Sequence, residues 1–88
     1  MRDEQEYILT MTVDNNIGVL TRITTQIRRE GLNIRRLAVE ETENPEVSRL
    51  TMTFSCLEGF YGGVLKRFSQ MSCVHEITEG KSLGRVWK

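Results

Sequence analysis

The chain has 88 residues, of which 39% are hydrophobic and 27% are charged, so it fits a single folded domain and is too apolar for a disordered tail. Twelve basic and twelve acidic residues cancel, which removes the long-range positive field that draws proteins to nucleic acid or anionic lipid. The N-terminus is charged where a signal peptide is apolar, and no apolar run could cross a bilayer. We therefore expect a cytoplasmic protein with neither a membrane nor a nucleic-acid partner.

The first predicted elements are a strand and a helix. Apolar and polar side chains alternate over residues 7–13, which is typical of a strand with one face on a core. Turn-forming residues 14–18 follow. Apolar residues then recur at the spacing of one helical face (Val19, Leu20, Ile23, Ile27). We expect a helix over 18–30, with two arginines in its last turn and Gly31 as its left-handed cap.

Two further strands are predicted in the middle of the chain. Residues 32–41 are rich in strand formers, but their alternation slips between Ile34 and Leu37, which indicates a bulge. The acidic segment 41–46 carries the only proline and should be an exposed connection. Residues 47–56 show the cleanest alternation in the chain and predict a strand.

The last predicted elements are a helix, a strand and a tail. Apolar residues at helical spacing predict a helix over 57–71 with a buried stripe (Phe60, Val64, Phe68, Met71). Gly62 and Gly63 should weaken this helix by roughly 1 kcal/mol each relative to alanine. A strand over 74–79 follows, and we expect the tail 81–88, which carries Trp87, either to dock on a partner or to fray.

The element order specifies an α+β fold. With right-handed crossovers, strand, helix, strand, strand, helix and strand form a ferredoxin-like βαββαβ sandwich, in which two helices cover one face of a four-stranded antiparallel sheet. We expect residues 1–80 to form this domain. The other face of the sheet should expose an apolar patch, which favours a homo-oligomer over a monomer.

The candidate binding site is the junction between the first strand and the first helix. A helix N-terminus presents free N–H groups and a positive dipole end, which suit a small carboxylate, and Gly18 permits close approach. The Asn15 amide could accept from an ammonium group, and Asn33 could add a polar contact. Apolar neighbours could line a slot (Ile17, Val19, Leu20, Ile34). Alternatively, Asn15 only caps the helix and Gly18 relieves strain, and spacing alone leaves both interpretations open.

Four sequence blocks resemble a known family. They are NNIGVLTR at 15–22, GLNI at 31–34, LAVEET at 37–42 and PEVSRLT at 45–51. Over residues 7–79 the chain resembles the N-terminal ACT domain of the acetohydroxyacid (acetolactate) synthase small subunit. Because long members carry a second domain and this sequence stops at Lys88, it resembles the short form.

The resemblance implies a function and a set of partners. It implies a non-catalytic subunit that activates the large, thiamine-diphosphate-dependent catalytic subunit and makes it sensitive to feedback by a branched-chain amino acid, usually valine. One methylene in an apolar pocket discriminates by only about 1–3 kcal/mol, so leucine and isoleucine remain alternatives. A free-standing ACT-type amino-acid sensor of a different enzyme is the alternative function.

The resemblance also implies the site residues. Family members hold the effector between two ACT domains, which implies a homodimer or a higher homo-oligomer. The contacts correspond to Asn15, Gly18 and Asn33. Neighbouring residues would supply backbone N–H groups and walls (Asn16, Ile17, Val19, Leu20).

The sequence argues against enzymatic activity of its own and against RNA recognition. It has one histidine, no paired acidic motif in a glycine-rich loop and no cysteine beside a base, so we expect neither catalytic residues nor a cofactor. Cys56 and Cys73 lack metal-ligand spacing and should be buried thiols. RNA-recognition domains share the element order, but their aromatic-rich strand motif is missing. A basic cluster could dock on the large subunit or simply be solvated (Arg28, Arg29, Arg35, Arg36).

Overall fold

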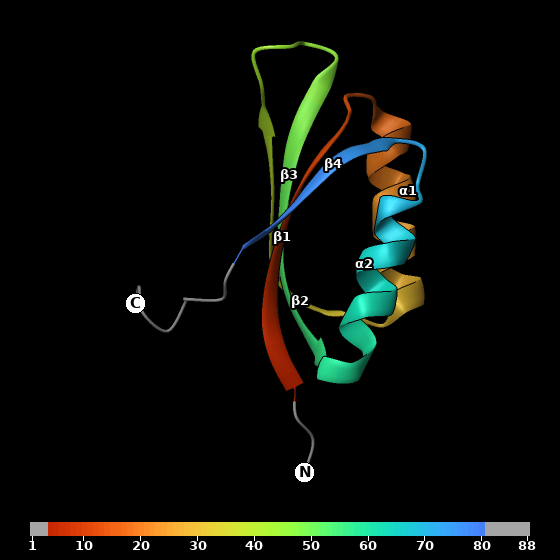
Figure 1. Ribbon diagram of the computed structural model, residues 1–88. Helices are drawn as coiled ribbons and strands as arrows, with labels where there is room; N and C mark the ends of the chain where they lie inside the picture. The colour runs from red at the N-terminus through yellow and green to blue at the C-terminus, as the bar shows by residue number, and fades with distance from the viewer. Residues whose placement is uncertain (1–3, 81–88) are drawn as a thin grey trace.

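A computed structural model describes residues 4–80 as a sheet covered on one face by two helices (Figure 1). The elements are β1 (Glu4–Asp14), α1 (Ile17–Glu30), β2 (Asn33–Glu41), β3 (Val47–Leu57), the 3₁₀ turn η1 (Glu58–Phe60), α2 (Tyr61–Ser69) and β4 (Val74–Gly80). The four antiparallel strands lie in the order β2-β3-β1-β4, which confirms the predicted ferredoxin-like fold. The predicted tail with Trp87 lies outside the described residues.

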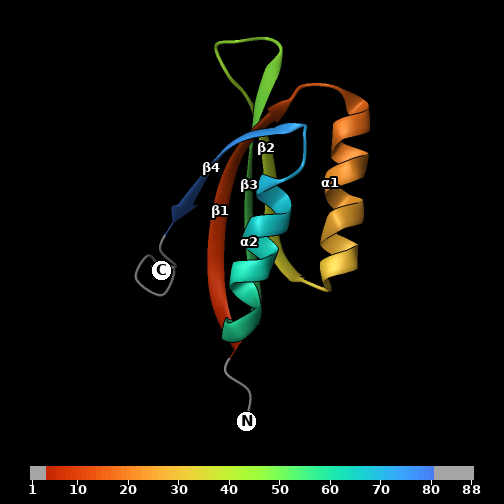
Figure 2. The ribbon, with the colours of Figure 1, turned by 45° about the vertical axis from the view of Figure 1, so that its right-hand side comes forward.

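Figure 2 shows both helices against one face of the sheet. The core lies between the helices and this face. Large, fully buried side chains come from every second position of β1 and β3 and from one stripe on each helix (Leu9, Met11, Val13, Leu50, Met52, Phe54, Ile23, Val64, Phe68). Antiparallel register places Leu9 opposite Met52, and directly opposite residues share a face. The predicted alternation in both strands is confirmed. Neither helix of residues 4–80 has the length and apolar composition of a membrane span.

The uncovered face of the sheet is rich in threonine. Thr10 and Thr51 lie opposite each other, with their hydroxyl oxygens 3.4 Å apart, and Thr12 and Thr53 share their face. Threonine suits this position because its branched side chain favours a strand while its hydroxyl stays hydrated. Within residues 4–80, the exposed large hydrophobic residues are elsewhere (Ile17, Leu20, Leu37, Val39, Phe60). The expected apolar patch on the open face was therefore wrong.

Strand β2 forms one edge of the sheet and contains the predicted bulge. Its register with β3 shifts between Ile34 and Arg36. After the bulge, Leu37 lies opposite Met52 and Val39 opposite Leu50, so both face the helix-covered side. They remain 39% and 45% exposed because no further strand lies beyond them in the described chain. An edge with apolar side chains and free backbone groups is suited to pairing with another strand.

The second helix is shorter than the predicted range 57–71. Leu57 ends β3, and residues Glu58–Phe60 form a 3₁₀ turn before α2 begins. Since a 3₁₀ turn holds about 3.0 residues rather than 3.6, it rotates Phe60 away from the stripe that Val64 and Phe68 form. Phe60 is 63% exposed, so its assignment to the core was wrong.

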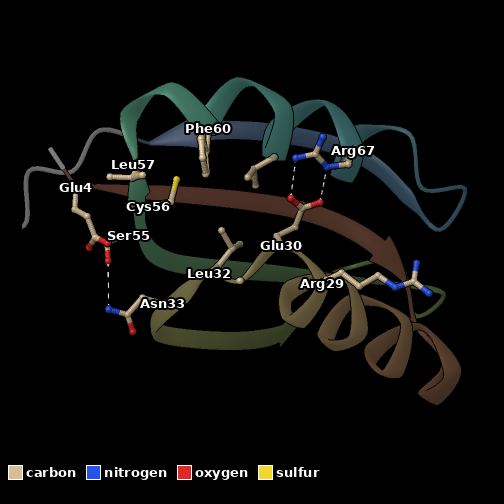
Figure 3. A pocket seen from close by; sticks show the side chains of 12 residues that line it. Glu4, Arg29, Glu30, Leu32, Asn33, Ser55, Cys56, Leu57, Phe60 and Arg67 are labelled. Atoms are coloured by element: carbon tan, nitrogen blue, oxygen red, sulfur yellow. Dashed lines mark hydrogen bonds and ion pairs between the residues drawn. The ribbon is translucent and has the colours of Figure 1, made fainter. Parts of the chain in front are cut away.

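Glu30 and Arg67 join the two helices (Figure 3). The Arg67 guanidinium donates from Nε to Glu30 Oε2 at 2.6 Å and from Nη2 to Oε1 at 2.8 Å. Gln26 Nε2 also donates to Glu30 Oε2, at 2.6 Å. The Glu30 side chain is only 6% exposed, whereas that of Arg67 is 52% exposed. The hydrogen bond from Arg67 is the main reason why the pKa of Glu30 lies below its ordinary value.

Glu30→Gln is expected to make the free energy of unfolding depend less on pH at acid pH. Because the folded state lowers the pKa of Glu30, the interaction stabilises the fold above the unfolded pKa of about 4.3 and is lost as pH falls through the folded value. Screening at the half-exposed arginine limits this contribution to roughly 1 kcal/mol. Urea unfolding at several pH values between about 3 and 7 measures it. If the native and variant curves ran parallel, this interpretation of the pair would be wrong.

Gly63 provides the space that Arg67 occupies, whereas Gly62 has open surroundings. A Cβ at Gly63 would lie 3.0 Å from Arg67 Nη2, and a Cβ at Gly62 would have no neighbour within 4 Å. Gly62→Ala should therefore raise the free energy of unfolding by about 0.5–1 kcal/mol through helix propensity. Gly63→Ala should gain less, because the guanidinium must move away from Glu30. Thermal unfolding compares the two variants, and equal gains would contradict this role of Gly63.

Candidate ligand site

The predicted binding loop lies where β1 ends at Asp14 and α1 begins at Ile17. Asn16 is the N-cap, since its backbone is extended and its Oδ1 accepts from the Val19 N–H at 3.2 Å. Asn15 therefore does not cap the helix. Gly18 has no positive φ, so it relieves no backbone strain either, and both parts of the alternative interpretation of this loop were wrong.

Two backbone donors at the start of α1 are free. The N–H groups of Ile17 and Gly18 lie in the first helical turn. The carbonyl four residues earlier, which would accept from each of them, lies outside the helix. Within residues 4–80 neither group donates a hydrogen bond, whereas the Val19 N–H is bound by Asn16. A Cβ at Gly18 would meet only Asn16 Oδ1, at 3.4 Å, so the position is open to an approaching ligand. Free donors at the positive end of a helix dipole suit a carboxylate.

A surface pocket of about 390 Å³ lies at the same loop, and Ile17 lines it. The loop, the first turn of α1, the end of β1 and the strands β2 and β3 all contribute to its lining (Val13, Asp14, Asn15, Asn16, Ile17, Leu20, Val39, Ser48). Ile17 is 85% exposed and, with Leu20 and Val39, forms an apolar rim. The pocket thus combines polar residues of the loop with an apolar rim, as a small amphiphilic ligand requires.

The Asn15 side chain connects this loop to the β2–β3 connection. Its Oδ1 accepts from Ser48 Oγ at 3.0 Å, and its Nδ2 donates to the Pro45 carbonyl at 2.9 Å. Its backbone N–H donates to the Glu46 carbonyl at 2.9 Å. An asparagine amide has two acceptor and two donor positions, so one of each remains for a ligand.

The structure brings part of the predicted site together. Asn15, Asn16, Ile17 and Leu20 line one pocket, and Gly18 lies in the same turn. Val19 is different, because it is only 3% exposed and its N–H is already bound. Its side chain belongs to the core, and its assignment to the pocket was wrong.

Strand β2 begins at the opposite end of α1 from the binding loop (Figure 1), and Asn33 and Ile34 are its first two residues. This helix has 14 residues and is therefore about 21 Å long, which exceeds the length of an amino acid. Asn33 lines a different hollow, of about 420 Å³, and its Nδ2 donates to Ser55 Oγ at 3.5 Å (Figure 3). Ile34 packs against the core opposite Phe54. Within one chain, neither residue can contact a small ligand bound at the loop.

Sequence reasoning did not assign four residues of this pocket, namely Val13, Asp14, Val39 and Ser48. Ser48 carried a signal, because it occupies a core-facing position in the alternation of β3 and is nevertheless polar. It is 5% exposed. A buried hydroxyl needs a hydrogen-bond partner, and here the partner is Asn15.

The cysteines are placed as predicted. Cys56 and Cys73 are free and buried. Burial is the main cause that raises the pKa of the Cys56 thiol, which keeps it protonated and a poor nucleophile. Across residues 4–80, no three His, Cys, Asp or Glu side chains gather where they could hold a metal ion.

Comparison with known proteins identifies relatives of the chain. Residues 9–79 match a family model described as the AHAS small subunit-like ACT domain. The acetolactate synthase small subunit of Mycobacterium avium is 33% identical over 84 residues, which cover 92% of this chain and 50% of that protein. A probable acetolactate synthase small subunit of Archaeoglobus fulgidus is 32% identical over 77 residues, covering 84% of this chain and 48% of its own length.

Solved structures agree with this relationship. The acetolactate synthase small subunit from Thermotoga maritima has a TM-score of 0.80 at 26% identity, covering 92% of this chain and 50% of its own. The ACT domain from GTP pyrophosphokinase of Chlorobium tepidum has a TM-score of 0.72 at 10% identity and shares the fold alone. The chain spans about half the length of the small subunits it matches. The family match and the shared architecture show that the chain belongs to the AHAS small subunit-like ACT domains.

Proposed function

We propose that this chain is a non-catalytic regulatory domain of acetolactate synthase that binds a branched-chain amino acid, with valine as the effector. One observation supports the ligand most directly. The N–H groups of Ile17 and Gly18 are free in the first turn of α1, and Ile17 lines a pocket with an apolar rim, at the loop that the family resemblance assigns to the effector. The names of its relatives support acetolactate synthase as the regulated enzyme.

A zwitterion with a short apolar side chain matches the chemistry of the pocket. The carboxylate would accept from the Ile17 and Gly18 N–H groups, and the ammonium would donate to the unused lone pair of Asn15 Oδ1. The side chain would lie against the apolar rim formed by Leu20 and Val39. Since the rim is open, it sets only a modest preference among valine, leucine and isoleucine.

A second copy of the chain would complete the site. Asn33 is too far from the binding loop to act within one chain, and β2 is an edge strand with exposed Leu37 and Val39. If two β2 strands paired antiparallel across a twofold axis, Asn33 of one copy would approach the loop of the other. The dimer would bury the apolar side chains at this edge and create two equivalent effector sites.

The regulatory effect would follow from linkage between the two sites and the catalytic subunit. An effector that contacts both copies stabilises one arrangement of the dimer, and that arrangement engages the large subunit differently. A coupling free energy of about 1–3 kcal/mol is sufficient.

Calorimetric titration with L-valine, L-leucine and L-isoleucine tests the ligand, with D-valine as a control for stereospecificity. Saturable heat with the L-amino acids alone is the expected result, and no heat with any of them would contradict the proposal. A pull-down from native extract tests the regulated enzyme. Recovery of the thiamine-diphosphate-dependent large subunit supports acetolactate synthase, whereas recovery of another enzyme would indicate the free-standing sensor instead.

A further inference from the structure

Ser48 is a buried polar residue beneath the binding loop. It belongs to β3, opposite Val13 of β1 and Glu41 of β2, and is 5% exposed. Its hydroxyl donates to Asn15 Oδ1 at 3.0 Å and lines the same pocket as the loop. This hydrogen bond joins residues that are far apart in the sequence.

Two partners fix the orientation of the Asn15 amide. The Pro45 carbonyl can only accept, so it selects the Nδ2 side of the amide at 2.9 Å. Ser48 can then donate to the Oδ1 side. Together they prevent the amide from rotating, and they leave one N–H and one lone pair of defined direction.

The β2–β3 connection that carries Pro45 is itself held in place. Thr42 Oγ1 lies 2.9 Å from both the Asn44 and the Val47 carbonyl oxygens and can donate its one proton to either, and Asn44 Oδ1 accepts from the Glu46 N–H at 2.9 Å. The carbonyl that accepts from Asn15 therefore belongs to a segment with several hydrogen bonds of its own. Ser48 supplies the remaining bond that holds the carbonyl side of the amide.

We propose that Ser48 is a positioning residue for the effector, acting through the Asn15 amide. This inference rests on the proposed function. By donating to Oδ1, the Ser48 hydroxyl holds the carbonyl so that its second lone pair faces the pocket, where the ammonium group of the amino acid binds. Polarisation of the carbonyl by this first hydrogen bond strengthens the second.

The test compares valine affinity and thermal stability in the full chain and three variants. Ser48→Ala removes the hydroxyl, and Ser48→Thr keeps it. Thr51→Val is the matched control, because it removes a hydroxyl from the same strand on the opposite face, where its partner is Thr10. Calorimetry with L-valine gives the affinity, and thermal unfolding gives the stability.

Ser48→Ala is expected to weaken valine binding about tenfold, as loss of one oriented hydrogen bond would, while Ser48→Thr restores it and Thr51→Val leaves it unchanged. If Ser48→Ala and Thr51→Val lower the melting temperature by similar amounts and only Ser48→Ala loses valine affinity, reduced stability does not explain the loss of affinity. Native affinity in Ser48→Ala, or an equal loss in Thr51→Val, would overturn the inference. Failure of the native chain to bind valine would instead refute the proposed function.

Discussion

Gly18→Asp is expected to abolish valine binding and to leave the fold intact. The new carboxylate would occupy the free donors of the first turn of α1 and repel the carboxylate of the effector. Two like charges about 4 Å apart repel by about 4 kcal/mol at an effective dielectric of 20, so an affinity loss on the order of hundredfold or more is expected. The fold should tolerate the change, because the position has no positive φ and an acidic residue suits a helix N-terminus.

Gly18→Ala separates the effect of charge from that of bulk. An alanine Cβ would meet only Asn16 Oδ1, at an ordinary 3.4 Å, so this variant should retain most of its affinity. Calorimetry with L-valine and thermal unfolding should be measured on both variants. Valine binding that persists in a folded Gly18→Asp chain would show that the effector binds elsewhere.

Phe68→Ala is expected to cost about 3–5 kcal/mol, a large part of the stability of a domain of this size. Phe68 is completely buried, and among the residues of α2 only Val64 is buried with it. Removing the ring would leave a cavity and would detach a nine-residue helix that is too short to persist alone. We therefore expect the sheet to lose the cover that α2 gives it.

Phe60→Ala is the matched control for Phe68→Ala. Phe60 has the same side chain, is 63% exposed and precedes α2 by one residue. Its substitution should change the free energy of unfolding by no more than about 0.5 kcal/mol. Urea unfolding measures both variants, and similar losses would show that the core does not extend between α2 and the sheet as described.

The fold was predictable because apolar and polar residues alternate along most of β1 and β3. Leu50, Met52 and Phe54 face the core at every second position, and the slip after Ile34 correctly indicated the bulge in β2. The start of α2 was not predictable, because the same apolar spacing fits a continuous helix or a 3₁₀ turn followed by one. The apolar character expected for the open face was also wrong, since threonine favours a strand without exposing a large apolar surface.

The candidate site was predictable where it is local in sequence. The asparagines and the glycine before α1 indicated the loop, although only the structure shows that Asn16 and not Asn15 is the cap. Ser48 and Val39 come from other strands and enter the pocket through the sheet register, which periodicity alone does not define. The separation of Asn33 from the loop follows from the length of α1, and a single copy cannot close that gap.

A mixing experiment tests the two-copy site most directly. In a homodimer of Gly18→Asp chains, every site has an altered loop. In a homodimer of Asn33→Ala chains, every site lacks the Asn33 amide. In a mixed dimer, one site unites the intact loop of one copy with the intact Asn33 of the other. After an equal mixture is unfolded and refolded together, about one quarter of all sites should bind L-valine with native affinity, given random pairing. If the mixture bound no more valine than the two separate variants combined, the site would lie within one copy and the account would be wrong.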